Sequence, residues 1–266
     1  KQKRRAEQAA PVPRCPRPRT TAYMTTKQSP HPFRPGTESP RLLITAGPTH
    51  EPIDAVRYLG NRSSGRLGIE LAQQATSLNW PAHLLLGPTH LVPATKGTAL
   101  TRFRSTSDLA TLLNSTLPEC DILIMAAAVA DYTPAAPLPG AKIRRSEGDP
   151  LTLELRPTPD LLAASSKGAR PDQLMVGFAL EPADGLKASA TDKLRRKGVD
   201  LLVANPLETM ESPDIEATLI ASEPLKSFEQ QTPRLTKTQF AQWLLPILND
   251  AWLAKRSRNS SKSTHA

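Results

Sequence analysis

The chain has 266 residues, of which 38% are hydrophobic and 22% charged, and this composition is typical of a soluble globular protein. No apolar run approaches the roughly 18 residues that a membrane-spanning helix needs, and the basic start lacks the apolar stretch of a secretory signal. The two cysteines, Cys15 and Cys120, are too few for a disulfide framework or a structural zinc site. These features predict a reduced, cytoplasmic protein that has no membrane partner.

The net charge of +9 lies at the two ends of the chain. Residues 1–40 carry nine Lys/Arg against two Glu, and residues 251–266 carry four Lys/Arg and no acid, so the ends hold +7 and +4. Subtracting both from +9 leaves −2 for residues 41–250. A nucleic-acid-binding module, which the overall basicity suggests, would carry its positive charge on the folded body. We therefore expect no nucleic-acid partner.

The ends also differ from the middle in pattern. Residues 1–40 contain eight of the 27 prolines and show no apolar periodicity, which predicts a disordered basic tail. Residues 255–266 are predicted to be a second disordered tail. One folded domain is therefore expected over residues 41–254.

Within this domain, apolar runs alternate with helical patterns. A helix is predicted over 63–78, with Ser63 or Ser64 as its N-cap, and a last amphipathic helix over 237–254, kinked at Pro246. The alternation predicts an α/β fold with a largely parallel sheet and helices on both faces. Two further helices are predicted over 108–116 and 184–197, and strands over 41–46, 81–87, 101–105, 121–128, 151–155, 174–179 and 200–204.

Three features follow predicted strands, where ligands bind in such sheets. After the first strand, Gly47 begins a turn that leads through residues 61–68 into a helix N-terminus, whose free N–H groups suit a phosphate. An ordinary capped helix explains this stretch equally well. Its spacing matches neither a G-x-G-x-x-G nor a Walker A motif.

The second feature is AAAVADY (126–132), whose small residues let a ligand approach the backbone and whose acid could bind a hydroxyl. Tight packing with a solvated Asp131 is the alternative. The third feature is KIRR (142–145), where a basic loop could close over a triphosphate. A solvated run of charge is the commoner explanation of such a loop.

Taken together and in this order, these motifs resemble phosphopantothenate–cysteine ligase, the synthetase of coenzyme A biosynthesis. That enzyme is often fused in bacteria to a flavin-dependent decarboxylase. The resemblance covers about residues 41–222. It rests on TAGPTHEPIDAVRYLGNRSSGRLG (45–68), AAAVADY (126–132), KIRR (142–145), TPDLL (158–162), VGFALE (176–181) and KLRRKGVDLLVAN (193–205).

The resemblance implies a Rossmann-like, three-layer fold and a ligase that joins 4′-phosphopantothenate to L-cysteine. A nucleoside triphosphate, CTP in bacterial members and ATP in eukaryotic ones, activates the carboxylate through an acyl-nucleotide with Mg²⁺ present. The cysteine amine then displaces the nucleotide. No metal ligands are assigned, and no flavin is expected in this chain.

The resemblance also implies roles for individual residues. Asn61 matches an asparagine that contacts phosphopantothenate and the acyl intermediate, and Lys142 matches the lid lysine, so these two are the expected catalytic residues. Arg57 matches an arginine that reaches the pantothenate phosphate from the neighbouring subunit. That match implies a homodimer.

Ala127 and Ala128 match backbone contacts to the substrate, and Asp131 matches an acid that binds substrate and nucleotide. Phe178 could equally be a core residue, Lys193 and Lys197 an exposed helix face, and Asn205 part of a turn. The positions that match nucleotide-binding residues are Gly47, Ser63, Gly65, Gly68, Asp131, Lys142, Thr158, Pro159, Asp160, Leu161, Phe178, Lys193, Lys197 and Asn205.

The chain departs from the family pattern in two places. The lid motif has arginines where lysines are usual, and the segment 206–220 is shorter than in bacterial members, which leaves the choice between CTP and ATP open. No decarboxylase domain precedes residue 41, so a stand-alone synthetase, or one half of a fused protein with a separate decarboxylase as partner, is expected. An NAD(P)-binding reductase of similar fold is the alternative function.

Overall fold

The computed structural model describes residues 39–94, 97–138, 140–144, 148 and 150–263. The tail predicted over 1–40, with Cys15, lies almost entirely outside the described residues, as does Arg145 of the basic loop. None of the helices in the described ranges combines the length and the apolar character that crossing a bilayer requires.

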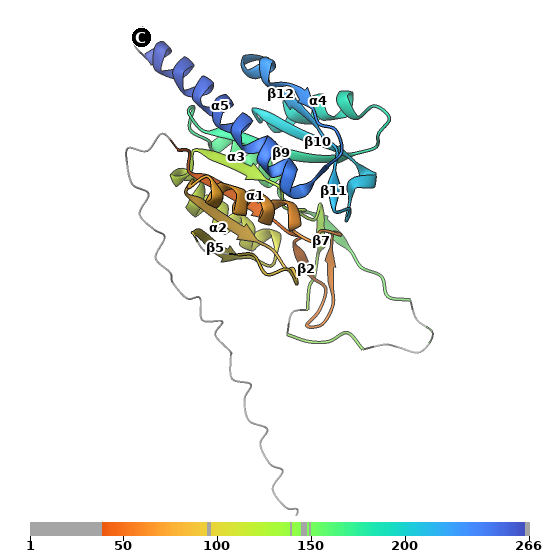
Figure 1. Cartoon of the computed structure of the whole chain (residues 1–266). Helices are drawn as coiled ribbons and strands as arrows, with labels where there is room; N and C mark the ends of the chain where they lie inside the picture. The colour runs from red at the N-terminus through yellow and green to blue at the C-terminus, as the bar shows by residue number, and fades with distance from the viewer. Residues whose placement is uncertain (1–38, 95–96, 139, 145–147, 149, 264–266) are drawn as a thin grey trace, which may run out of the picture. The chain divides into compact units, whose positions relative to one another are not determined.

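An eight-stranded sheet forms the centre of the domain, in the order β13-β12-β10-β9-β6-β1-β4-β5 (Figure 1). Six neighbouring strands are parallel, and β12 and β13 extend the sheet beyond β10 through antiparallel pairing. The parallel strands follow the 3-2-1-4-5-6 order of the Rossmann fold, so the order reverses between β1 and β6, and the predicted fold class is confirmed. The strands are β1 (Leu42–Ala46), β4 (Ala82–Leu86), β5 (Thr98–Arg102), β6 (Ile122–Met125), β9 (Leu174–Glu181), β10 (Leu201–Pro206), β12 (Thr218–Ala221) and β13 (Gln230–Gln231).

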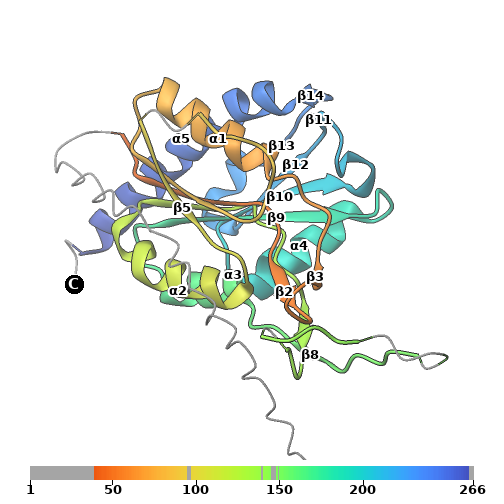
Figure 2. The same ribbon diagram turned by 90° about the horizontal axis from the view of Figure 1, so that it is seen from below.

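Helices cover both faces of this sheet, as Figure 2 shows. Helices α1 (Arg66–Ser77) and α5 (Lys237–Ser263) lie on one face, and α2 (Thr106–Thr116), α3 (Leu161–Gly168) and α4 (Leu186–Lys197) on the other. Strand β1 shows why the sheet is central: Leu42 and Ile44 pack into the core under α1 and α5, whereas Leu43 packs into the core under α2. A strand buried on both faces reads as a continuous apolar run.

Short antiparallel strand pairs project from the carboxyl end of the sheet. The sequence patterns predicted none of these pairings. Strand β2 (His50–Pro52) pairs with β3 (Tyr58–Gly60), β7 (Tyr132–Pro134) with β8 (Leu155–Pro157), and β11 (Asp214–Ile215) with β14 (Leu235–Thr236). The first two pairs, called the arms below, contact each other through β2 and β7. Within the described ranges, 3₁₀ turns also form at Leu117–Glu119, Leu207–Thr209 and Glu223–Phe228.

Several predicted boundaries are wrong. The strand predicted over 101–105 lies at Thr98–Arg102, and the one predicted over 151–155 is reduced to Leu155–Pro157. Neither Ser63 nor Ser64 caps α1, because the helix begins after Gly65, a left-handed residue at φ 73°. Glycine adopts that conformation without steric cost.

The disordered tail predicted from residue 255 is also wrong over its described part, since α5 continues to Ser263 and passes through the exposed Pro246. Several contacts hold this extension in place, among them hydrogen bonds from Arg258 to the Pro224 carbonyl and from Asn259 to the Pro171 carbonyl. Lys255 Nζ donates to Asp200 at 2.7 Å, and the Arg256 guanidinium lies 4.7 Å from the ring centre of the buried Trp252. The ion pair of Lys255 and the cation–π contact of Arg256 therefore help to order a segment that its basic composition had predicted to be disordered.

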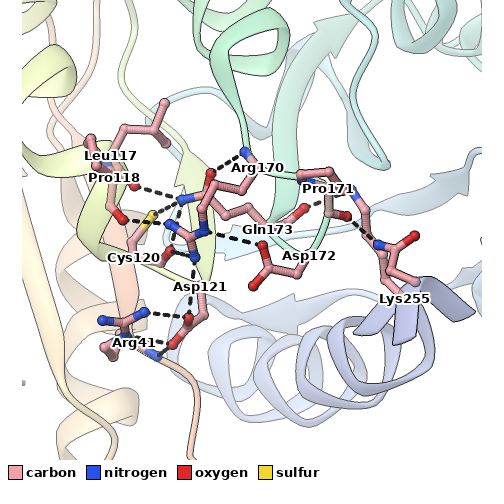
Figure 3. A network of polar contacts seen from close by, with 11 residues as sticks. Arg41, Leu117, Pro118, Cys120, Asp121, Arg170, Pro171, Asp172, Gln173 and Lys255 are labelled. Atoms are coloured by element: carbon pink, nitrogen blue, oxygen red, sulfur yellow. Dashed lines mark hydrogen bonds and ion pairs between the residues drawn. The ribbon is translucent and has the colours of Figure 1, made fainter. Parts of the chain in front are cut away.

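A polar network joins the amino-terminal ends of the strands to α5 (Figure 3). Arg41 donates to both oxygens of Asp121 at 2.8 Å, and Gln173 donates to the Cys120 carbonyl at 2.8 Å. Lys255 reaches the Gln173 carbonyl at 2.7 Å. Burial raises the pKa of the Cys120 thiol to about 12, which leaves it protonated and inert. This network lies at the opposite end of the strands from the loops that follow β1 and β6.

Candidate functional site

A cleft of about 1000 Å³ opens where the strand order reverses, over the carboxyl ends of β1 and β6. It collects the loops after β6 and β10, the carboxyl-terminal part of β9, and the first turns of α1, α3 and α5. All but three of the predicted site residues line it: Asn61, Ser63, Gly65, Gly68, Ala127, Ala128, Asp131, Thr158, Pro159, Asp160, Leu161, Phe178, Lys193, Lys197 and Asn205.

The N-terminus of α1 forms one wall of the cleft. A Cβ on Gly68 would lie 2.3 Å from the Ala46 Cβ, so only glycine lets the helix approach the end of β1 this closely. The first hydrogen bond of the helix runs from Ile69 N to Gly65 O, which leaves the N–H groups of Leu67 and Gly68 without a helical partner. This wall can accept an anion. Gly47 does not line the cleft but packs beneath Gly65.

The loop after β6 forms the facing wall, and the end of β1 fixes its backbone. Thr45 Oγ1 accepts a hydrogen bond from Ala127 N at 3.1 Å, and Thr49 Oγ1 accepts one from Ala130 N at 2.9 Å. Thr158 Oγ1 donates to the Ala130 carbonyl at 2.5 Å. Threonine hydroxyls thus hold a chain of small residues in one conformation, while Asp131 stays exposed at its end.

Asn61 links the two walls. Its Nδ2 donates to the Val129 carbonyl at 3.0 Å and lies 3.4 Å from the Ala128 carbonyl. The side chain is exposed to the cleft, so a ligand can reach the amide.

The two predicted nucleotide-binding lysines of α4 are paired with carboxylates. Lys193 Nζ lies 3.4 Å from Glu181, and Lys197 donates to Asp160, the N-cap of α3. Burial would raise the pKa of Asp160, but the hydrogen bonds from Lys197 and from the Ala163 N–H, together with the nearby positive charges, lower that pKa. Asn205 donates to Thr209 at 2.6 Å, which fits the turn interpretation as well as a binding role.

Arg57 and Lys142 lie outside the cleft of their own chain. Arg57 binds Asp54 on the first arm and donates to the Ile143 carbonyl at 2.7 Å. Lys142 is exposed on the neighbouring segment. Burial would raise the pKa of Asp54, but hydrogen bonds from the Arg57 and Val56 N–H groups and from the Arg57 side chain hold it well below its ordinary value.

Comparison with known proteins identifies this arrangement. The domain family described as DNA/pantothenate metabolism flavoprotein, C-terminal domain, matches residues 37–251. The chain belongs to this family. The resemblance found in the sequence is thereby confirmed.

Individual relatives agree with that assignment. The coenzyme A biosynthesis bifunctional protein CoaBC of Mycobacterium bovis is 41% identical over 173 residues, which are 62% of this chain and 41% of that protein. A protein named cysteine/cysteine sulfinic acid decarboxylase, from an unknown prokaryotic organism, is 43% identical over 168 residues, or 63% of this chain and 46% of that protein. This chain spans about half the length of the curated relatives it matches.

A solved structure extends the comparison to the whole fold. The crystal structure of the C-terminal domain of a CoaBC protein is 30% identical, with a TM-score of 0.65, and the match covers 80% of this chain and 97% of that one. The family domain is therefore present here almost in full.

The structure brings three further basic side chains to the cleft, none of which the sequence patterns had singled out. Arg62, Arg66 and Lys237 all line the cleft. The two arginines flank the Ser-Ser-Gly turn, where a count of basic residues could have found them. Lys237 is the first residue of α5, and no motif marks it; only the packing of α5 against α1 brings it to the cleft.

Proposed function

We propose that this domain is a phosphopantothenate–cysteine ligase of coenzyme A biosynthesis. A carboxylate oxygen of 4′-phosphopantothenate would attack the α-phosphorus of CTP or ATP, and the bond to the bridging oxygen would break to release pyrophosphate. The cysteine amine would then attack the acyl carbon of the acyl-nucleotide. A C–N bond forms, a proton is lost and the nucleoside monophosphate leaves. The product is 4′-phosphopantothenoylcysteine.

One observation carries this proposal. The cleft at the strand reversal places an anion-accepting wall, the α1 N-terminus, opposite a rigid backbone wall, the 126–131 loop, with the Asn61 amide between them. A nucleotide phosphate and an acyl group would therefore meet at Asn61. An amide there can donate to the oxyanion that forms during acyl transfer. A carboxylate in its place would repel the oxyanion, and a lysine amine could itself attack the acyl carbon. The name of the CoaBC relatives fits this chemistry.

Mg²⁺ is the proposed cofactor, and it would enter with the triphosphate. The described residues hold no cluster of three or more His, Cys, Asp or Glu side chains that could bind an ion alone. Mg²⁺ usually takes one or two carboxylates together with substrate phosphates and waters. Asp131, exposed in the cleft, fits the part of the single carboxylate. Bound there, the ion would neutralise phosphate charge.

The proposal includes a homodimer formed through the arms. Large apolar side chains are exposed on them: Val56 is 63% exposed, Tyr58 50% and Tyr132 53%. Such a patch beside the mouth of a site marks an interface. A second copy of the chain is the expected partner, because Arg57 sits on this arm rather than in its own cleft. A separate phosphopantothenoylcysteine decarboxylase is the expected partner in the pathway.

The test is turnover by the purified full chain. With phosphopantothenate, cysteine, Mg²⁺ and CTP or ATP in parallel reactions, we expect release of pyrophosphate and of CMP or AMP, and the faster nucleotide identifies the preference. Omitting cysteine tests for the acyl-nucleotide by mass spectrometry. No turnover with any nucleoside triphosphate contradicts the proposal. Saturable NADPH binding without nucleotide binding would instead favour the reductase.

A further inference from the structure

The cations that line the cleft fall into two groups. In the first group, each lysine already has a carboxylate partner: Lys193 Nζ lies 3.4 Å from Glu181, and Lys197 donates a hydrogen bond to Asp160. Among the described residues, the side chains of Arg62, Arg66 and Lys237 make no hydrogen bond or ion pair. A ligand with several negative charges gains most from cations that no carboxylate already neutralises.

Lys237 differs from the two arginines in burial. Arg62 and Arg66 are exposed, whereas Lys237 is partly buried in the cleft wall. An ammonium in that position has lost part of its hydration and has gained no partner in return. Burial and the charge of Arg66 lower the pKa of Lys237, and Asp214, which faces it from β11, only partly offsets them. Asp214 is itself bound to Arg234 at 3.3 Å.

The fold holds Lys237 in place. Thr236 and Gln239 form a reciprocal pair of hydrogen bonds around the start of α5, at 2.9 and 3.2 Å. The Lys237 N–H donates to the Pro213 carbonyl at 3.3 Å. Thr238 Oγ1 donates to Glu70 of α1 at 2.9 Å, which ties the first turn of α5 to the helix whose N-terminus forms the cleft wall. The lysine is therefore presented to the cleft at a fixed point.

We propose that Lys237, together with Arg66, binds the polyphosphate of the nucleoside triphosphate and holds it against the N-terminus of α1. The nature of this ligand rests on the proposed function. Phosphopantothenate also carries a phosphate, but the assignment to the nucleotide follows from position. Arg66 is the first residue of α1, and Lys237 lines the same cleft as Leu67 and Gly68, whose N–H groups have no helical partner. The same contact would stabilise the pyrophosphate as it leaves.

The test compares Lys237→Met and Lys237→Gln with the conservative Lys237→Arg. The control is Lys167→Met, which removes an exposed lysine from the last turn of α3, outside the cleft. Calorimetric titrations use inorganic pyrophosphate and, separately, CTP or ATP. We expect Kd for both probes to rise about tenfold or more in the Met and Gln variants, as for loss of one charge-assisted hydrogen bond. Lys237→Arg and the control should stay near the wild type.

Two further readouts separate binding from a structural role. Because an anion favours the charged ammonium, wild-type binding should take up protons from alkaline buffer, and Lys237→Met should abolish this uptake. KM should rise for the nucleotide and not for cysteine or phosphopantothenate. Unchanged Kd and proton uptake in folded Met or Gln variants would overturn the inference. A rise in KM for phosphopantothenate alone would overturn the assignment to the nucleotide. A wild type that binds no nucleotide would contradict the proposed function itself.

Discussion

Arg57 and Asp54 form an ion pair within one chain, with Arg57 Nε and Nη2 at 3.0 and 2.5 Å from Asp54 Oδ2. The same carboxylate oxygen accepts the Ile143 N–H at 3.1 Å, and Arg57 donates to the Ile143 carbonyl at 2.7 Å. Ile143 adjoins Lys142, the expected lid lysine. The pair therefore fastens the segment that carries Lys142 to the first arm.

Asp54→Asn should release that segment. The amide keeps one oxygen for the Val56 and Arg57 N–H groups, but it replaces the oxygen that binds the Arg57 side chain and Ile143 N–H with a donor. We expect trypsin to cleave at Lys142 several times faster and turnover to fall. Limited proteolysis and steady-state kinetics measure both effects. Asp192→Asn, which breaks an exposed pair with Arg196, is the control. Equal cleavage rates in the variant and the wild type would contradict the fastening role.

Lys142→Ala should lower turnover strongly while leaving the melting temperature nearly unchanged. Lys142 is exposed, and its neighbour Ile143 supplies the backbone contacts that hold the segment. Truncating an exposed side chain seldom changes stability by more than about 0.5 kcal/mol. Kinetics and thermal unfolding together check this expectation. Normal turnover with a large fall in melting temperature would make Lys142 a structural residue.

Arg57 also tests the dimer, because it lies outside the cleft of its own chain. An inactive Arg57→Ala protein mixed with an inactive Asn61→Ala protein should regain activity. If each site takes Arg57 from the partner, some mixed dimers contain one site in which both residues are intact. Subunit exchange is verified separately with two tagged forms. Proven exchange without recovered activity would show that one chain builds the whole site.

The sequence predicted the parts of the domain that follow long-range periodicity. The continuous apolar run of β1 and the apolar stripe of α1 are long enough for their periodicity to be recognised. Most site residues that the resemblance predicted lie in one cleft. Apart from the misplaced strand that overlaps β8, the arms were not predicted, because strands of three residues are too short to show alternation. The position of Lys237 in the cleft and the pairing of Lys197 with Asp160 depend on contacts between elements far apart in the sequence. No local pattern records such contacts.

The Asp121 network predicts a pH dependence of stability. Burial would raise the pKa of Asp121, but the hydrogen bonds from Arg41 lower it below its ordinary value. A depressed carboxyl pKa stabilises the fold fully above the unfolded value of about 3.9, and the contribution is lost as the pH falls through the folded value. Asp121→Asn should cost about 2 kcal/mol at pH 7, the scale of a charged hydrogen bond, and much less near pH 3.

Urea unfolding at pH 7, 5 and 3 measures this difference. Asp192→Asn is again the control, since its pair with Arg196 is more than half exposed on both sides and should contribute less than about 0.5 kcal/mol at any pH. A cost for Asp121→Asn that is the same at pH 3 and pH 7 would show that the charge of Asp121 does not matter to the fold.

Asn61 offers the most direct test of the proposed chemistry. Its Nδ2 donates to the Val129 carbonyl, so the amide both holds the 126–131 loop and can turn toward a ligand. Asn61→Asp places oxygen where the donor was, which removes the contact to Val129 and any donor to an oxyanion. Asn61→Ala removes the same contact without adding charge. Because the residue is exposed, both variants should fold and form the dimer like the wild type.

If Asn61 stabilises the oxyanion, both variants should slow amide formation by on the order of a hundredfold or more, the size of losing one oxyanion donor. If it only holds the loop, KM for phosphopantothenate should rise and kcat should change little. Single-turnover reactions quenched for mass spectrometry locate the step. Accumulated acyl-nucleotide places Asn61 in the attack of cysteine, and its absence places the residue in activation. Folded variants that turn over at the wild-type rate would exclude a catalytic role for Asn61.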